Sequence, residues 1–131
     1  MAEEDAPLVL YVEDEPAVLE LGVSALEEGG FRVASASTGA GAIRQLETPD
    51  AAFAALVTDI DLGDNSSGWE VARRARELFP DLPVVYVSGG SAHEWASRGV
   101  PGSVMLTKPF ALAQLVVAVS NATLERPGPG G

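Results

Sequence analysis

The stretch LVLYVEDEPAVLELGVSALEEGGFRVASA, residues 8–36, decides the fold of this chain. Its first five residues are all apolar and predict a buried strand. Residues 15–28 have helical spacing, with Pro16 suited to the first turn and a Gly-Gly pair to end the helix. Residues 31–36 alternate apolar and polar side chains, as a strand with one wetter face does. A strand, a helix and a strand in this order predict a βαβ unit with parallel strands.

The same alternation continues along the chain. Thr38 can cap a weaker helix that contains two glycines, and Pro80 follows the clearest helix. Glycines flank a fourth helix, which we expect to be short or irregular. The further predicted strands are 54–58, 83–88 and 103–107, and the further helices are 39–47, 69–79, 91–98 and 111–125. Strands alternating with helices predict an α/β fold, with a parallel sheet between two layers of helices.

Length and composition are those of one ordinary domain. The chain has 131 residues, 47% hydrophobic and 21% charged, which is enough for a real core. We expect an acidic N-terminal extension at 1–6, one folded domain at 7–125 and a disordered tail at 126–131. No apolar run approaches the roughly 18 residues of a membrane span, and the N-terminus lacks a signal-peptide pattern. We therefore expect a cytoplasmic protein.

The charge of the chain disfavours two classes of partner. Asp and Glu number 19 against 8 Lys and Arg, a formal net charge of −11. Nucleic acids and anionic membrane surfaces both attract Lys and Arg, so we expect neither as a partner. The chain contains no cysteine, which excludes disulfides and thiolate metal sites.

Polar side chains follow most of the predicted strands, where each strand ends. Open parallel sheets bind their ligands at the carboxyl ends of the strands, so these side chains should lie together. They are Glu13 and Asp14, then Asp59 with Asp61 two residues later, then Ser88, then Lys108 before Pro109. Each residue alone is more often a cap or a turn residue. Their joint occurrence favours a site instead.

This set of side chains would support phosphoryl chemistry. Clustered carboxylates need a hard cation, and carboxylate and carbonyl oxygens are the ligands that Mg²⁺ prefers. With the charge neutralised, one carboxylate can attack a phosphoryl group and form an acyl phosphate. Phosphoryl transfer depends on positioning and electrostatics, which Lys108 and the Ser88 hydroxyl could supply. The pattern therefore predicts a phosphoryl-accepting site that uses Mg²⁺.

These motifs resemble the receiver domain of bacterial two-component response regulators. The matching pieces are VEDEP, LVTDIDL, YVSGG and LTKPF, and the resemblance covers about residues 7–125. It implies a flavodoxin-like αβα sandwich with a five-stranded parallel sheet in the order 2-1-3-4-5. It also implies a partner, because receivers take their phosphoryl group from the histidine of a kinase or of a phosphotransfer protein.

The resemblance assigns the acids to two roles. Asp59 would be the phosphoacceptor. Mg²⁺ would be held by Asp14, by Glu13 (through water), by Asp59 and by the backbone carbonyl of Asp61. Phosphorylation would shift a two-state equilibrium of the surface formed by the fourth and fifth strand–helix units.

The remaining motifs concern the switch. Ser88 would bond the phosphoryl oxygens, Lys108 would pair with the phosphate or with Asp59, and the bond before Pro109 would be cis. Receivers usually carry an aromatic residue in the middle of the fifth strand, and the matching residue here is Met105. The aromatic Tyr86 on the fourth strand is a candidate to compensate, although a core role is the simpler interpretation.

Only RPGPGG follows the last predicted helix, which favours a stand-alone receiver that signals through protein–protein contacts. We expect no enzyme activity beyond self-phosphotransfer and slow autodephosphorylation at Asp59. One alternative is a haloacid-dehalogenase-like phosphatase, because TDIDLG resembles the first motif of that family. That family, however, places its metal-binding acids after the lysine. A second alternative is a pseudo-receiver that binds without accepting phosphate, against which the intact Asp14, Asp59 and Lys108 argue.

Overall fold

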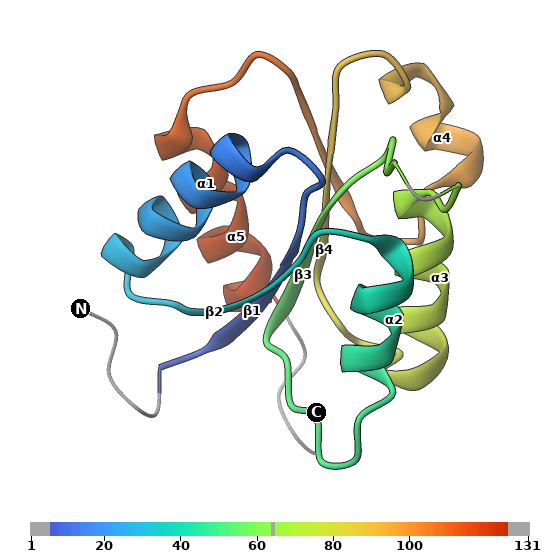
Figure 1. Cartoon of the computed structure of the whole chain (residues 1–131), viewed down its shortest axis with the longest axis horizontal. Helices are drawn as coiled ribbons and strands as arrows, with labels where there is room; N and C mark the ends of the chain where they lie inside the picture. Colours follow the sequence, from blue (N-terminus) through green and yellow to red (C-terminus); the bar gives the residue numbers. More distant parts are fainter. Residues whose placement is uncertain (1–5, 64, 126–131) are drawn as a thin grey trace.

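The computed structural model describes residues 6–63 and 65–125 and contains one parallel sheet of five strands in the order β2-β1-β3-β4-β5 (Figure 1). The strands are β1 (Leu8–Val12), β2 (Arg32–Ala36), β3 (Ala55–Asp59), β4 (Val84–Ser88) and β5 (Val104–Thr107). The helices are α1 (Pro16–Glu28), α2 (Gly39–Leu46), α3 (Gly68–Leu78), α4 (Trp95–Arg98) and α5 (Leu112–Glu125), with a 3₁₀ turn, η1 (Ala92–Glu94), before α4. This architecture confirms the flavodoxin-like fold expected from the sequence.

Every predicted element is present, and its ends lie within one residue of the prediction, except that the helix predicted at 91–98 is divided into η1 and α4, and α4 begins four residues later than predicted. Glu15 is the N-cap of α1 and not its first residue, and Asp59 is the last residue of β3 and does not follow it. The Thr38 hydroxyl caps α2 as predicted, accepting a hydrogen bond of 2.9 Å from the Gly41 amide. The predicted disordered tail and all but the last residue of the predicted N-terminal extension lie outside the described residues.

Helices cover both faces of the sheet and divide the core into two parts. Helices α1 and α5 lie on one face, and α2, α3 and α4 lie on the other (Figure 1). The part between the sheet and helices α1 and α5 includes Val9, Tyr11 and Leu26. The part between the sheet and the other helices includes Trp69 and Tyr86. All five residues of β3 and of β4 are buried, which explains why they are almost continuously apolar. None of the described helices is long and apolar enough to span a membrane.

The connection between β4 and β5 departs from the regular pattern. It consists of η1 and the single turn of α4, which confirms the short fourth helix expected from its flanking glycines. Met105 lies in the middle of β5, is partly buried and packs against the core under α2 and α3. Its register partner on β4 is Tyr86, which is fully buried. The core role expected for Tyr86 is therefore confirmed.

Candidate functional site

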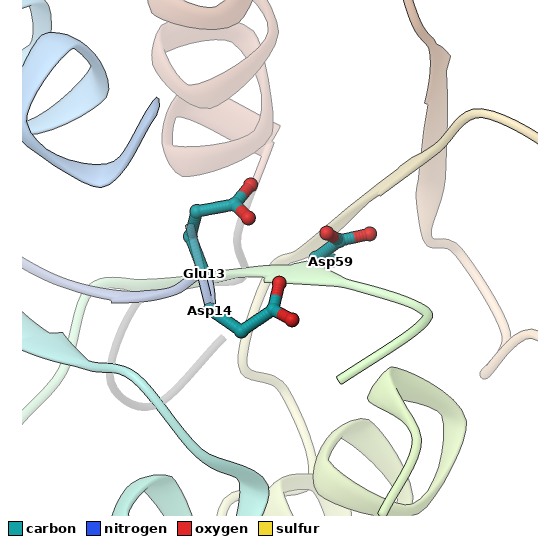
Figure 2. A group of neighbouring side chains, drawn as sticks. All are labelled: Glu13, Asp14 and Asp59. Carbon is teal, nitrogen blue, oxygen red and sulfur yellow. The ribbon is translucent and has the colours of Figure 1, made fainter. Parts of the chain in front are cut away.

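Three carboxylates meet at the carboxyl end of the sheet. Glu13 and Asp14 follow β1, Asp59 ends β3, and the β1–β3 register pairs Val12 with Thr58, so these acids lie side by side (Figure 2). Each acid offers an oxygen atom within 4.8 Å of the other two. The side chains of Glu13 and Asp59 are buried, whereas Asp14 is half-buried. The structure thus brings together three of the four acids that the sequence analysis selected at the strand ends.

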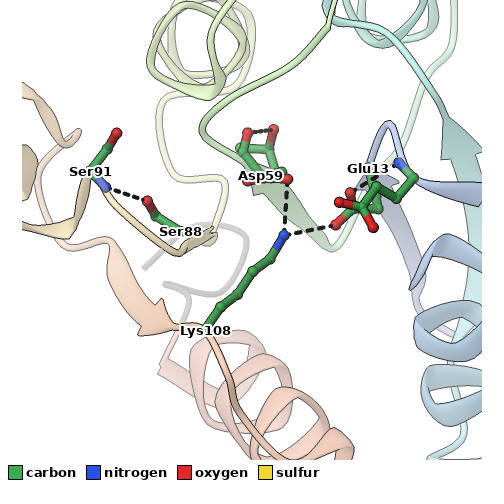
Figure 3. Close-up of polar contacts among 7 residues, drawn as sticks. Glu13, Asp59, Ser88, Ser91 and Lys108 are labelled. Carbon is green, nitrogen blue, oxygen red and sulfur yellow. Dashed lines mark hydrogen bonds and ion pairs between the residues drawn. The ribbon is translucent and has the colours of Figure 1, made fainter. Parts of the chain in front are cut away.

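Lys108 reaches these acids from the neighbouring end of β5. Its Nζ lies 3.1 Å from Oδ2 of Asp59 and 3.5 Å from Oε1 of Glu13 (Figure 3). The Lys108 amide donates a hydrogen bond of 2.8 Å to the Ser88 carbonyl, which continues the β4–β5 pairing up to the site. The bond between Lys108 and Pro109 is cis, as the resemblance implied.

Burial and neighbouring charges alter the ionisation of the site. Burial, then the charge of Asp59, raises the pKa of Glu13 from 4.5 to about 7, against the opposing effects of the Glu15 amide and Lys108. Burial lowers the pKa of Lys108, but the hydrogen bonds and charges of Asp59 and then Glu13 together outweigh it and leave that pKa raised. Burial, followed by the charges of Glu13 and Asp59, also raises the pKa of Tyr11.

The charges of the site do not balance within the described residues. When all are ionised, the three carboxylates of the cluster exceed the Lys108 ammonium group by two negative charges (3 − 1 = 2). The pKa of Glu13 is raised mainly by burial and further by the charge of Asp59, so this carboxylate tends to hold its proton unless positive charge is supplied. A hard divalent cation prefers oxygen ligands of this kind. The donor set therefore fits Mg²⁺.

Ser88 and Asp61, two further predicted site residues, are not members of the carboxylate cluster. Ser88 is buried at the end of β4, and its hydroxyl oxygen accepts a hydrogen bond of 2.7 Å from the Ser91 amide (Figure 3). Asp61 is exposed and pairs with Ser67 in an isolated antiparallel bridge between β3 and α3. The expectation for Asp61 concerned its carbonyl oxygen and stays a prediction.

Two glycines lie close to site residues, and the sequence did not predict these close approaches. A Cβ atom on Gly68 would collide with the carbonyl oxygen of Asp59, so the start of α3 lies directly against the end of β3. A Cβ atom on Gly63 would lie 3.3 Å from Oδ2 of Asp14. Gly68 directly precedes the helix predicted at 69–79, a place where glycine is well tolerated, so the sequence carried no distinctive signal for it.

Comparisons with known proteins agree with this geometry. A family profile described as "Response regulator receiver domain" matches residues 9–120. Response regulator receiver protein CpdR of Brucella abortus is 34% identical over 110 residues, which are 82% of this chain and 89% of CpdR. A crystal structure of a response regulator receiver protein from Sinorhizobium medicae aligns with a TM-score of 0.90 and 45% identity, over 95% of this chain and 100% of that one.

Other relatives are much longer than the matched region. Sensor kinase CckA of Brucella abortus is 34% identical over 116 residues, which are 86% of this chain but only 12% of CckA. The chain spans about half the length of several matched transcriptional regulators of Mycobacterium. The shared unit is thus one domain that occurs in proteins of different overall organisation.

Proposed function

The chain belongs to the family of response regulator receiver domains, and on that basis we propose that Asp59 accepts a phosphoryl group from a phosphohistidine of a partner protein. One observation carries this proposal: the buried Asp59 carboxylate lies 3.1 Å from the Lys108 ammonium group and beside the carboxylates of Glu13 and Asp14. An aspartate placed only to cap a turn would have no reason to share one buried end of the sheet with two acids and a lysine.

The reaction is a displacement at phosphorus. An oxygen of the Asp59 carboxylate forms a bond to phosphorus while the bond from phosphorus to the histidine nitrogen of the donor breaks, and the imidazole keeps the electron pair and takes a proton from solvent. Lys108 already contacts Oδ2 of Asp59, so its ammonium group is close to where negative charge gathers on the phosphoryl oxygens. The Ser88 hydroxyl supplies a hydrogen-bond donor at the next strand end.

The metal of this reaction would be Mg²⁺. Glu13, Asp14, Asp59 and the carbonyl oxygen of Asp61 would hold it, Glu13 through water. When bound, Mg²⁺ supplies positive charge that offsets the repulsion between the carboxylates and the incoming phosphoryl oxygens. The excess of two negative charges within the cluster and the raised pKa of Glu13 support this assignment.

The biological role follows from the reaction. Receiver domains are signalling modules, and the donor we propose is a histidine kinase or a histidine phosphotransfer protein. We further propose that residues 7–125 form the whole working unit and signal in the cytoplasm by protein–protein contacts without an output domain. The coverage of 89% of CpdR and of 100% of the Sinorhizobium medicae protein supports that organisation. Slow autodephosphorylation at Asp59 is the only hydrolytic activity expected.

Intact-mass measurement tests the proposal. The protein is incubated with acetyl phosphate and Mg²⁺, and one phosphoryl adduct is expected on the unaltered chain and none on Asp59→Asn. The matched control is Asp81→Asn, an exposed aspartate on the connection before β4, which should retain the adduct. An unmodified wild-type chain would favour the pseudo-receiver, and an adduct that persists in Asp59→Asn would show that another residue is the acceptor.

A further inference from the structure

Two side chains of β4 hold the two ends of the connection to β5. The Ser88 hydroxyl oxygen accepts a hydrogen bond of 2.7 Å from the amide of Ser91, at the start of the connection (Figure 3). The Tyr86 hydroxyl oxygen accepts one of 3.1 Å from the amide of Val100, just after α4. Side chains two positions apart on a strand share a face of the sheet, so both anchors lie on the face under α3 and α4.

The far anchor is deeply buried and reinforced. Tyr86 is fully buried, and its ring centroid lies 4.8 Å from that of Trp69 on α3. The Ser103 hydroxyl donates a hydrogen bond of 2.6 Å to the Val100 carbonyl and accepts one of 2.9 Å from the indole nitrogen of Trp95. These contacts tie the single turn of α4 to the strands on both of its sides.

Arg98 adds a contact to the same end of the connection. Its guanidinium carbon lies 5.6 Å from the centroid of the Trp69 ring, a distance typical of a cation–π contact. Because Trp69 also packs on Tyr86, Arg98 links α4 to this aromatic pair. Arg98 also forms an ion pair of 3.3 Å with Glu94, and the Ser97 hydroxyl donates a hydrogen bond of 3.1 Å to the Glu94 carbonyl. The segment from Glu94 to Ser103 is therefore docked through side chains that the site does not use.

The near anchor, in contrast, has little support. Gly89 and Gly90 are exposed, and a Cβ atom on Gly90 would have no neighbour within 4 Å. No residue of η1 is buried. The Ser88–Ser91 hydrogen bond is thus the main described side-chain contact from the sheet to the segment Gly89–His93.

We propose that phosphorylation frees the segment Gly89–His93 alone, while Tyr86 keeps the segment Glu94–Ser103 docked as the fixed end of the switch. The inference rests on the proposed function, because the event that frees the segment is a rotation of the Ser88 side chain. After this rotation the Ser88 hydroxyl donates its hydrogen bond to a phosphoryl oxygen on Asp59. When that hydroxyl turns toward the phosphoryl group, the Ser91 amide loses its acceptor, whereas the Val100 amide keeps the Tyr86 hydroxyl.

The position of Tyr86 explains how the switch can work with Met105 on β5. Tyr86 and Met105 are register partners, so the buried aromatic ring lies one strand away from Met105, at the same level of the sheet. From β4 the ring holds the end of α4 and does not depend on movement of Ser88. Tyr86 is then a positioning residue, and the surface that differs between the two states is the exposed segment that contains His93.

Amide hydrogen exchange followed by NMR on the full chain tests the two anchors without phosphate. Ser88→Ala removes the acceptor of the Ser91 amide, so exchange at Ser91 should rise by about tenfold while exchange at Val100 does not change. Tyr86→Phe should do the reverse. The matched control is Tyr11→Phe, a buried tyrosine on the opposite face of the sheet, which should change neither amide. The proposal would be overturned if Ser88→Ala or Tyr86→Phe accelerated exchange at both amides or at neither.

The same two amides are then followed in wild-type protein after incubation with acetyl phosphate and Mg²⁺, with the adduct quantified by intact mass. Faster exchange at Ser91 with unchanged exchange at Val100 supports the proposal. In phosphorylated Tyr86→Phe, the amides of both Ser91 and Val100 should exchange fast. A wild-type adduct that frees Val100, or that frees neither amide, overturns the split switch but leaves the proposed function standing. A missing adduct overturns the proposed function itself, and the exchange data for Ser88→Ala still decide whether the two anchors are separate.

Discussion

The pKa of Glu13 leads to a prediction about stability that needs no metal and no partner. Glu13 is 1% exposed, and its pKa is raised from 4.5 to about 7 by burial and by the charge of Asp59. The folded chain therefore binds a proton at this site between pH 4.5 and 7 that the unfolded chain has lost. The contribution of Glu13 to stability is complete below pH 4.5 and is lost as the pH rises through 7.

The size of the effect follows from the same two values. Moving the pKa from 4.5 to about 7 corresponds to about 3 kcal/mol, since a difference of one in pKa is about 1.36 kcal/mol. Of this, about 2 to 3 kcal/mol should be lost between about pH 5 and 8. The variant Glu13→Gln cannot titrate, so its free energy of unfolding should lack this loss, and its advantage over the wild type should grow with pH by that amount.

Urea unfolding in the presence of a chelator, followed by circular dichroism at several pH values, measures the difference. Glu125→Gln is the matched control, because Glu125 is exposed at the end of α5 and its substitution should give a curve parallel to that of the wild type. Adding Mg²⁺ at the highest pH should stabilise the wild type more than Glu13→Gln. Parallel curves for wild type and Glu13→Gln would refute the argument that Glu13 is a buried carboxylate short of positive charge.

Three further predictions concern the metal and the packing. Asp14→Ala should weaken Mg²⁺ binding by more than about tenfold in a calorimetric titration, whereas Glu125→Ala should not. Gly68→Ala should lower the free energy of unfolding by about 1 to 3 kcal/mol, although alanine is the better helix former, because the new methyl group meets the carbonyl oxygen of Asp59. Leu26→Ala should lower the free energy of unfolding by about 2 to 5 kcal/mol in urea unfolding, because Leu26 is fully buried on the face of α1 that packs against the sheet.

Each of these has an outcome that contradicts it. Equal Mg²⁺ affinities for Asp14→Ala and Glu125→Ala would place the metal elsewhere. A gain in stability for Gly68→Ala would mean that α3 can move away from β3 at little cost. A loss at Leu26→Ala no larger than that at Leu124→Ala, whose side chain is 83% exposed, would contradict the described packing of α1.

Most of the fold could be predicted because its signals are local. The strands that lie inside the sheet are buried on both faces and appear in the sequence as short apolar runs, such as LVLYV at 8–12. Caps and breakers such as Thr38 and Pro80 mark where helices begin and end. Even the brief α4 was foreseeable from the glycines around it.

The sequence was enough to predict which residues form the site, but not how they ionise or which of them are in contact. The rule that parallel strands end at one edge of a sheet was enough to bring Glu13, Asp14, Asp59 and Lys108 together. It could not show that Glu13 lies in a buried position that raises its pKa, or that Lys108 contacts two of the three acids. Those properties depend on which neighbours exclude water from each carboxylate.

By itself, the sequence determined the order of strands and helices, the chemistry of the strand ends and the family. Each of these depends on residue types at short spacings, which are visible along one dimension. Only the tertiary structure decided the rest: the close approach of Gly68 to Asp59, the burial of Glu13, and the anchoring of Val100 by Tyr86. These features join residues from different strands and loops, so their energies arise from packing and shared burial, which no local pattern encodes.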